Sequence, residues 1–377
     1  MKTYDWLVIG GGITGASLAY ELQNQGWKVL LLEPISTLEN ATRYSYGGLP
    51  FWSGNSPETR ELCQEGINLH RQLSDVLDGE TEFREINLLL TIRKGESPEE
   101  VVKQYQGCEM PPQLLSVEES CELEPLLNPR AIEGTICFPH GHINPKKTNE
   151  AYLKTFTRLG GEIAKETVNS FQFNQETVVG VKTNKNTYSA KNTVICAGGK
   201  TRHLGKQLGI KVPIYFTHAE LLETPPLDLK LNSLIMPAND QRLSLETNAT
   251  QPEKEQLWEE KEQKLAEAVI DPGAIQFCDR HLCIGQISRT ISDFQPKIDE
   301  KASESWLREE IGTLLPDLKD VPGKWQHCLI AFSPQGKATI GQLENYQGIY
   351  VFSGFTSPLL FAPPLAKRFA RSISESD

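Results

Sequence analysis

The stretch VIGGGITGASLAYEL, residues 8–22, lies almost at the N-terminus and decides the first part of the fold. The residues that lead into its glycines, 4–9, are typical of a β-strand, and residues 14–25 carry apolar side chains at helical spacing. The segment KVLLLE at 28–33 follows, and its apolar run is typical of a buried parallel strand. A strand, a helix and a second strand within about 30 residues predict a βαβ unit.

Three glycines between the first strand and the helix form the pattern G-x-G-x-x-G. Gly10 permits a tight turn, Gly12 lets backbone N–H groups approach a pyrophosphate, and Gly15 lets the helix pack closely on the strand. Glu33 ends the second strand, where its carboxylate is placed to accept hydrogen bonds from a ribose. The agreement of these features predicts a dinucleotide site rather than a turn without a ligand. At this point the dinucleotide is either a nicotinamide cofactor or a flavin.

The composition narrows the class of protein. The 377 residues are enough for one large or two medium domains, and the formal net charge of −11 argues against nucleic-acid partners and anionic membrane surfaces. No apolar run approaches the ~20 residues of a transmembrane segment, and we expect no secretory signal before the first strand. The eight cysteines have neither CxxC nor metal-type spacing. They predict reduced thiols, no metal site and a cytoplasmic location.

The middle of the chain gives weaker signals. Helices are predicted at 58–77 and 146–158, a hairpin-like stretch at 83–93, and two strands joined by a polar turn at 178–199. Ser116 and Glu119 have the spacing of a capping box at the start of a short helix.

The second half of the chain is predicted to be rich in strands. The pattern from 213 to 293 is strand-like, with an interruption at 252–269. There Trp258, Leu265 and Val269 would share one side of a charged helix. Residues 325–377 alternate strands with turns and end in a helix.

Beyond Glu33 the regular alternation expected of a nicotinamide-binding domain stops, and other segments follow in a fixed order. These segments are ATRYSYGG (41–48), ELEPLL (122–127), HGHINPKKTNEAYLKTFTRLGGEI (140–163), ETV (166–168), TVICAGG (193–199), FSPQGKATIG (332–341) and YVFSGFTSPLLFAPPLA (350–366). Together with the glycine pattern they resemble the D-amino-acid oxidase superfamily of FAD-dependent oxidoreductases. The resemblance is to the glycine oxidase and sarcosine oxidase branch in particular, and it covers nearly the whole chain.

This resemblance implies tightly bound FAD and a fold of α/β plus α+β class. A Rossmann-like βαβ domain that binds FAD is expected at 1–80, 140–212 and 325–377. A substrate domain with a mixed or antiparallel sheet is expected at 81–139 and 213–324. The residues expected to bind FAD are Gly10, Gly12, Ile13, Thr14, Gly15, Glu33, Pro34, Thr42, Arg43, Ser45, Val168, Ala197, Gly198, Gly199, Gly354, Phe355, Thr356 and Ser357.

The sequence departs from the family where the substrate's carboxylate would be held by a cation. The arginine of glycine oxidase-like members falls on Ile330, and the two lysines of sarcosine oxidase-like members fall on Cys283 and Phe361. Gln335 replaces the usual Asp of the neighbouring turn. A buried carboxylate without a cation costs several kcal/mol. Either another cation serves, or the substrate is not a simple amino acid.

Four residues are candidates for binding or orienting the substrate. Arg289 follows a strand that, by the resemblance, lines the substrate pocket, so it could bind the substrate. Alternatively, it is a surface arginine near Asp293. His218 is a candidate base or, alternatively, a hydrogen-bonded structural histidine. Tyr44 and Tyr46 would either orient an amine at the flavin face or only pack beside the flavin.

One cysteine is a candidate for covalent attachment of the flavin. Sarcosine oxidase-like members attach FAD through a Cys just before the turn that resembles 332–341, and this position falls on Cys328. The alternative, a buried core cysteine, is favoured because one match in spacing is thin evidence.

The resemblance implies oxidation of the C–N bond of an amine or amino-acid-like small molecule. A hydride would pass to flavin N5, and oxygen would reoxidise the flavin. Two alternatives stay open. One is a dehydrogenase of the same fold that passes electrons to a quinone or a protein. The other is a flavoprotein without turnover that acts as a binding module.

Overall fold

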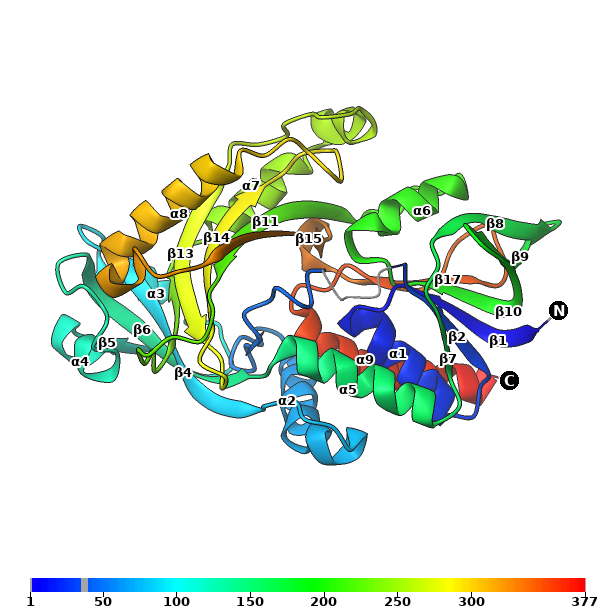
Figure 1. Ribbon diagram of the computed structural model, residues 1–377, viewed down its shortest axis with the longest axis horizontal. Helices are drawn as coiled ribbons and strands as arrows, with labels where there is room; N and C mark the ends of the chain where they lie inside the picture. Colours follow the sequence, from blue (N-terminus) through cyan, green and yellow to red (C-terminus); the bar gives the residue numbers. More distant parts are fainter. Residues whose placement is uncertain (1, 35–39, 377) are drawn as a thin grey trace.

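The computed structural model describes residues 2–34 and 40–376, and Figure 1 shows both ends of the chain on the same side of the molecule. Its described strands form a sheet of eight strands and a sheet of nine, which we call the first and second sheets. The first contains the predicted βαβ unit, and the second mixes antiparallel and parallel pairs. The predicted fold class is confirmed.

The first sheet is built on parallel strands in the order β17-β10-β1-β2-β7, with β16 antiparallel at one edge and β9 pairing with β10 and β8. Alternate residues of β2 enter two different core clusters: Val29 and Leu31 pack on one face of the sheet, Leu30 and Leu32 on the other. This strand is therefore buried on both faces, as its apolar run predicts. The bounds are β1 (Thr3–Ile9), β2 (Val29–Leu32), β7 (Glu162–Ala164), β8 (Val168–Asn174), β9 (Thr177–Thr183), β10 (Thr187–Ile195), β16 (Thr339–Gln342) and β17 (Ile349–Ser353).

Four helices form a layer against this sheet, as Figure 1 shows for α1, α5 and α9. They are α1 (Ile13–Asn24), α2 (Pro57–Leu77), α5 (Pro145–Arg158) and α9 (Pro358–Ser376). Gly66 lets α2 and α9 come close, because a Cβ there would lie 2.6 Å from the Leu360 carbonyl oxygen. The helices predicted at 58–77 and 146–158 are confirmed as α2 and α5. None of the described helices has the length and apolar character needed to cross a bilayer.

The second sheet has the order β15-β11-β14-β13-β12-β4-β6-β3, with β5 paired to β6. Helix α8 (Glu300–Leu314) covers one face, which we call the outer face. The opposite, inner face packs against residues from 41 to 52, the segment that follows the βαβ unit. The bounds are β3 (Gly48–Leu49), β4 (Arg84–Arg93), β5 (Gln113–Leu115), β6 (Ile132–His142), β11 (Tyr215–Glu223), β12 (Leu234–Pro237), β13 (Val269–Gln276), β14 (Leu282–Arg289) and β15 (Lys324–Phe332).

Short helices complete the description. They are α3 (Pro98–Lys103), α4 (Val117–Leu123), α6 (Thr201–Gln207), α7 (Gln241–Ala249) and the 3₁₀ helices η1 (Gly198–Lys200), η2 (Pro252–Glu259), η3 (Pro316–Leu318) and η4 (Pro334–Gly336). The capping box before α4 is confirmed: Ser116 Oγ accepts from Glu119 N, and Glu119 Oε2 accepts from Ser116 N.

Two local predictions were wrong. The stretch 83–93 is one strand, β4, because it runs between β6 and β12 without a turn. The charged helix at 252–269 is reduced to η2, and α7 was not predicted. Trp258 and Leu265 still reach a common core, but η2 and an irregular segment carry them there. Burial of two apolar side chains therefore did not require the helical spacing that suggested the helix.

The two sheets support a division into two domains, which stays a proposal. The expected boundary at residue 325 would cut into β15, and β15 pairs with β11 of the second sheet along its whole length. We therefore propose that the last segment of the FAD-binding domain begins after Phe332.

Candidate functional site

The carboxyl ends of four parallel strands bring the predicted cofactor residues to one edge of the first sheet. Gly10 follows β1, Glu33 follows β2, Ala197 comes shortly after β10, and Gly354 follows β17. The strands β2 and β10 lie on opposite sides of β1, so the strand order reverses at this place. Such an edge is where open α/β sheets bind dinucleotides.

The turn between β1 and α1 depends on its glycines. Gly10 has a φ of +111°, and a Cβ there would lie 2.5 Å from the Cys196 carbonyl oxygen. A Cβ on Gly15 would lie 1.9 Å from the Gly10 carbonyl oxygen. Both contacts are shorter than any side chain tolerates, so the pattern holds β1, α1 and β10 close together.

The start of α1 fits a pyrophosphate. Gly12 is the N-cap residue, and the first helical turn has no acidic side chain to repel an anion. Glu33 Oε2 accepts a hydrogen bond from Gly11 N at 2.6 Å, and Thr42 Oγ1 accepts one from Ile13 N at 3.0 Å. At the end of β10, a Cβ on Gly198 would meet no atom within 4 Å, which leaves space beside this turn.

The loop before α9 is tied to the loop after β15. Gly354 has a φ of +81°, and its carbonyl oxygen accepts a hydrogen bond from Ser333 Oγ at 3.0 Å. Thr356 Oγ1 donates to the Gly336 carbonyl oxygen at 2.8 Å. The other residues expected to bind FAD follow one of the four strand ends in the sequence. Val168 is the exception, because it begins β8. Those that follow a strand end are Thr14, Pro34, Arg43, Ser45, Gly199, Phe355 and Ser357.

The inner face of the second sheet meets this edge through the segment 41–48. Thr42 binds the first turn of α1, whereas Tyr44 and Tyr46 pack in the core cluster of the inner face. The same cluster contains Cys283 and Cys328 and contacts Ile330. The positions on which the resemblance places an arginine and a lysine therefore lie on the inner face, and Ile330 and Cys283 carry no charge there. Phe361 packs instead against the helix layer of the first sheet.

Burial governs the thiols of the inner face. The Cys328 side chain is 6% exposed, and burial raises its pKa to about 12. Burial also raises the pKa of the Cys283 thiol well above its ordinary value. The thiolate is the form that would attack the flavin, and a raised pKa disfavours it. We therefore predict that Cys328 only packs in the core and forms no bond to FAD.

Two of the four substrate candidates lie on the outer face. Arg289 Nε donates to Glu220 Oε1 at 2.6 Å, and its guanidinium lies beside Trp306 of α8. Its partner is therefore Glu220, not Asp293. His218 is paired with Arg289 across β11 and β14 and turns to the same face.

The polar partners of His218 are structural. Its Nδ1 shares a hydrogen bond with His327 Nε2 at 2.8 Å, and its Nε2 lies 3.1 Å from the Ile291 carbonyl oxygen. Burial lowers the pKa of His218 to about 4. Both Arg289 and His218 are thus turned away from the inner face that Tyr44 and Tyr46 contact.

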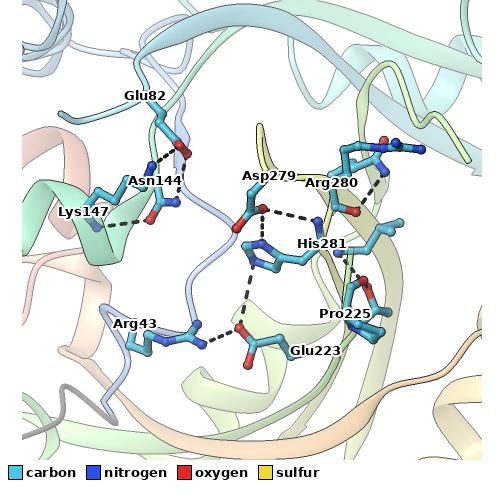
Figure 2. A network of polar contacts seen from close by, with 12 residues as sticks. Arg43, Glu82, Asn144, Lys147, Glu223, Pro225, Asp279, Arg280 and His281 are labelled. Atoms are coloured by element: carbon cyan, nitrogen blue, oxygen red, sulfur yellow. Dashed lines mark hydrogen bonds and ion pairs between the residues drawn. The ribbon is translucent and has the colours of Figure 1, made fainter. Parts of the chain in front are cut away.

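Arg43 belongs to a polar network that the sequence did not reveal. Figure 2 shows its guanidinium directed at Glu223, at the end of β11, with 2.5 Å between Nη2 and Oε1. His281 lies 4.0 Å from the same carboxylate and 2.5 Å from Asp279. Arg43 is therefore engaged with the second sheet. No local pattern in the sequence links it to a carboxylate so far along the chain.

The comparisons with known proteins agree with this arrangement. The family model described as DAO, FAD dependent oxidoreductase, matches residues 5–372. The chain therefore belongs to this family of FAD-dependent oxidoreductases, whose cofactor is FAD.

Three similar proteins illustrate the range of the family. The 4-methylaminobutanoate oxidase (formaldehyde-forming) of Paenarthrobacter nicotinovorans is 23% identical over 374 residues, which cover 97% of this chain and 43% of that protein. The peroxisomal sarcosine oxidase of Homo sapiens is 30% identical over 226 residues, which cover 56% of this chain and 54% of that protein. The matches thus span about half, or less, of these relatives. The structure of glycine oxidase from Geobacillus kaustophilus superposes with a TM-score of 0.81 at 18% identity and covers 100% of this chain and 96% of that chain.

Proposed function

We propose that the chain is an FAD-dependent enzyme that oxidises the C–N bond of an amine or amino-acid-like substrate. The observation that carries this proposal is the convergence of Gly10, Glu33, Ala197 and Gly354 at one sheet edge that the inner face of a second sheet meets. The similarity to relatives named as oxidases of methylaminobutanoate and sarcosine supports the substrate class.

Each part of the site has a role in this chemistry. When bound, FAD supplies an acceptor for the substrate's hydride and passes the electrons on. The N-terminus of α1 holds the pyrophosphate through backbone N–H groups, and Glu33 accepts from the ribose. The inner face orients the substrate's α-carbon towards the flavin and excludes water. The substrate loses a hydride from carbon and a proton from nitrogen, and water hydrolyses the resulting imine.

Simple amino acids are expected to be poor substrates. The positions that would supply a cation carry Ile330 and Cys283. A carboxylate beside these two side chains would lose its water without gaining a partner from them. We expect kcat/KM for glycine to stay below about 10⁴ M⁻¹s⁻¹, the lower end of ordinary enzyme values.

Anaerobic mixing with an amine panel tests the proposed function. Purified protein should be yellow, and amines should bleach its visible flavin absorbance. The panel contains D- and L-amino acids, N-methylglycine and small polyamines. If no member bleaches the flavin, the alternative of a binding module without turnover replaces this proposal.

The electron acceptor is a separate question. We propose oxygen, and stopped-flow reoxidation of the bleached protein tests it. Slow reoxidation by oxygen with fast reoxidation by a quinone would favour the dehydrogenase alternative. The cytoplasm stays our prediction for the compartment.

A further inference from the structure

Asp271 is a carboxylate on the inner face. Its charge acts on Tyr46, which packs against the core cluster of the inner face, so Asp271 lies on the inner side of β13. Two residues further along, the Gly273 carbonyl oxygen lies 3.5 Å from Tyr46 Oη. Tyr46 comes from the segment that Thr42 ties to the start of α1. Asp271 therefore lies on the side of the second sheet that meets the cofactor edge.

One oxygen of this carboxylate lacks a partner. Among the backbone and side-chain groups that the structure describes, none donates a hydrogen bond to Asp271 Oδ1, which is shielded from solvent. Asn239 donates a side-chain hydrogen bond to the carboxyl group and Arg242 lies near it, but burial outweighs both and raises the pKa of Asp271. The guanidinium of Arg242 is committed to Glu246, with 2.9 Å between Nε and Oε1.

Two arginines reach the inner face, and each is paired with a glutamate. Arg242, whose charge acts on Asp271 and Cys328, is paired with Glu246, and Asp271 has no ion pair among the described residues. The positions of the expected cations carry Ile330 and Cys283, and Arg43 is paired with Glu223. A buried carboxylate oxygen without a donor is costly, and a ligand cation removes that cost by supplying the missing donor.

We propose that Asp271 binds an ammonium group of the substrate, and that the substrate is an amine with a second cationic group, such as a diamine. The inference rests on the proposed function and adds the substrate class to it. The reacting nitrogen must be neutral to lose a hydride from its α-carbon, so the bound ammonium is the distal one. In this substrate an ammonium takes the place of the carboxylate of an amino acid. On the protein, the carboxylate of Asp271 takes the place of the cation that would bind that carboxylate.

Three ligands with the same four-carbon chain test the inference: putrescine, butylamine and γ-aminobutyrate. They differ in the distal group, which is an ammonium, a methyl group or a carboxylate. Calorimetric titration of the reduced holoenzyme without oxygen measures binding without turnover. We expect putrescine to bind at least about tenfold more tightly than butylamine, and γ-aminobutyrate to bind most weakly.

The variant Asp271→Asn keeps the shape of the side chain and removes its charge. It should lose the preference for putrescine and bind butylamine as the wild type does. Asp317→Asn, at an exposed position in η3, is the matched control and should keep the preference. Flavin content and melting temperature check folding. Asp271→Asn should not lower the melting temperature, whereas loss of a structural ion pair would.

The outcomes separate this inference from the proposed function. If amines bleach the flavin but putrescine has no advantage, or Asp271→Asn keeps that advantage, the inference is overturned and the function stands. If putrescine binds in an Asp271-dependent way but no amine bleaches the flavin, the site stands and the function is overturned. If putrescine neither binds nor bleaches the flavin, the inference is overturned, and bleaching by the rest of the amine panel decides the function.

Discussion

Gly12 shows what a single residue does at the start of α1. It is the N-cap residue, and a Cβ there would lie 3.1 Å from Thr42 Oγ1. A longer side chain would occupy the space in front of the helix, where we propose that backbone N–H groups bind the pyrophosphate. Gly107 offers a contrast, because a Cβ there would meet no atom within 4 Å.

We expect Gly12→Leu to purify as a folded protein with less than about a tenth of the normal flavin content. The lost hydrogen bonds to a charged pyrophosphate are worth about 1.5–3 kcal/mol each. The ratio of visible to ultraviolet absorbance measures the flavin content, and circular dichroism measures the fold. Gly107→Leu is the control and should keep its flavin. A folded Gly12→Leu protein with full flavin content would show that the pyrophosphate lies elsewhere.

We expect Cys328 to have no covalent bond to FAD. Its burial and raised pKa disfavour the thiolate that would attack the flavin ring. Acid precipitation should leave all yellow colour in the supernatant, and the intact mass should equal that of the bare chain. Colour in the pellet that disappears in Cys328→Ser would instead identify a covalent link.

At the scale of the element, the outer face of β11 and β14 is held by polar pairs beneath α8. Glu220 is fully buried and accepts from Arg289 Nε at 2.6 Å and from Trp325 Nε1 at 3.2 Å. Arg289 Nη2 also donates to Ser303 Oγ at 3.3 Å, which joins the strand to α8. This arrangement explains why Arg289 has a structural rather than a substrate-binding environment.

We expect Arg289→Met to lower the free energy of unfolding by about 2–3 kcal/mol. The substitution leaves the buried Glu220 carboxylate without its cation. The hydrogen bond from Trp325 only partly compensates for the lost ion pair. Urea unfolding measures this loss. Arg280→Met, which breaks an exposed pair with Asp228, should cost less than about 1 kcal/mol. Flavin content and amine oxidation should stay normal in both variants. A normal stability with lost substrate binding would restore Arg289 as a substrate residue.

At the scale of the whole molecule, buried histidines make stability depend on pH. Burial lowers the pKa of His70 and His218 to about 4, and of His140 and His142 to about 3. In the unfolded chain these groups take up protons below about pH 6.5. The unfolded state then binds more protons than the folded state, so stability falls as the pH drops from about 6.5 towards about 4.

Buried carboxyl groups act in the opposite direction. Burial raises the pKa of Glu21 to about 7, so its contribution falls as the pH rises from about 4.5 to about 7. Burial also raises the pKa of Asp271 and of Glu124. The four histidines outnumber these three groups, and the net effect should follow the histidines.

We expect the free energy of unfolding to be at least about 2 kcal/mol higher at about pH 7 than at about pH 5. Urea unfolding at the two pH values measures it. Glu21→Gln removes one opposing group and should make the difference larger. A higher stability at the lower pH would show that the histidines are not buried in their neutral form.

The amino-acid sequence determined the parts of this protein that depend on neighbouring residues. The βαβ unit, its glycine turn and helices α2 and α5 follow from apolar periodicity and from turn and capping residues, all read within short windows. The order of the motifs also identified the family and hence FAD. These features are local, so no knowledge of distant contacts was needed.

Only the tertiary structure decided which face of each strand meets the cofactor edge. Alternation along β11 and β14 defines two faces, but the packing of α8, distant in sequence, made the face of His218 and Arg289 the outer one. Asp271 stands in an Asp-Pro-Gly sequence typical of a turn, yet it lies within β13, where the register shifts. Arg43 likewise met Glu223 only through folding. Contacts between distant segments have no local signature, because folding alone brings their residues together.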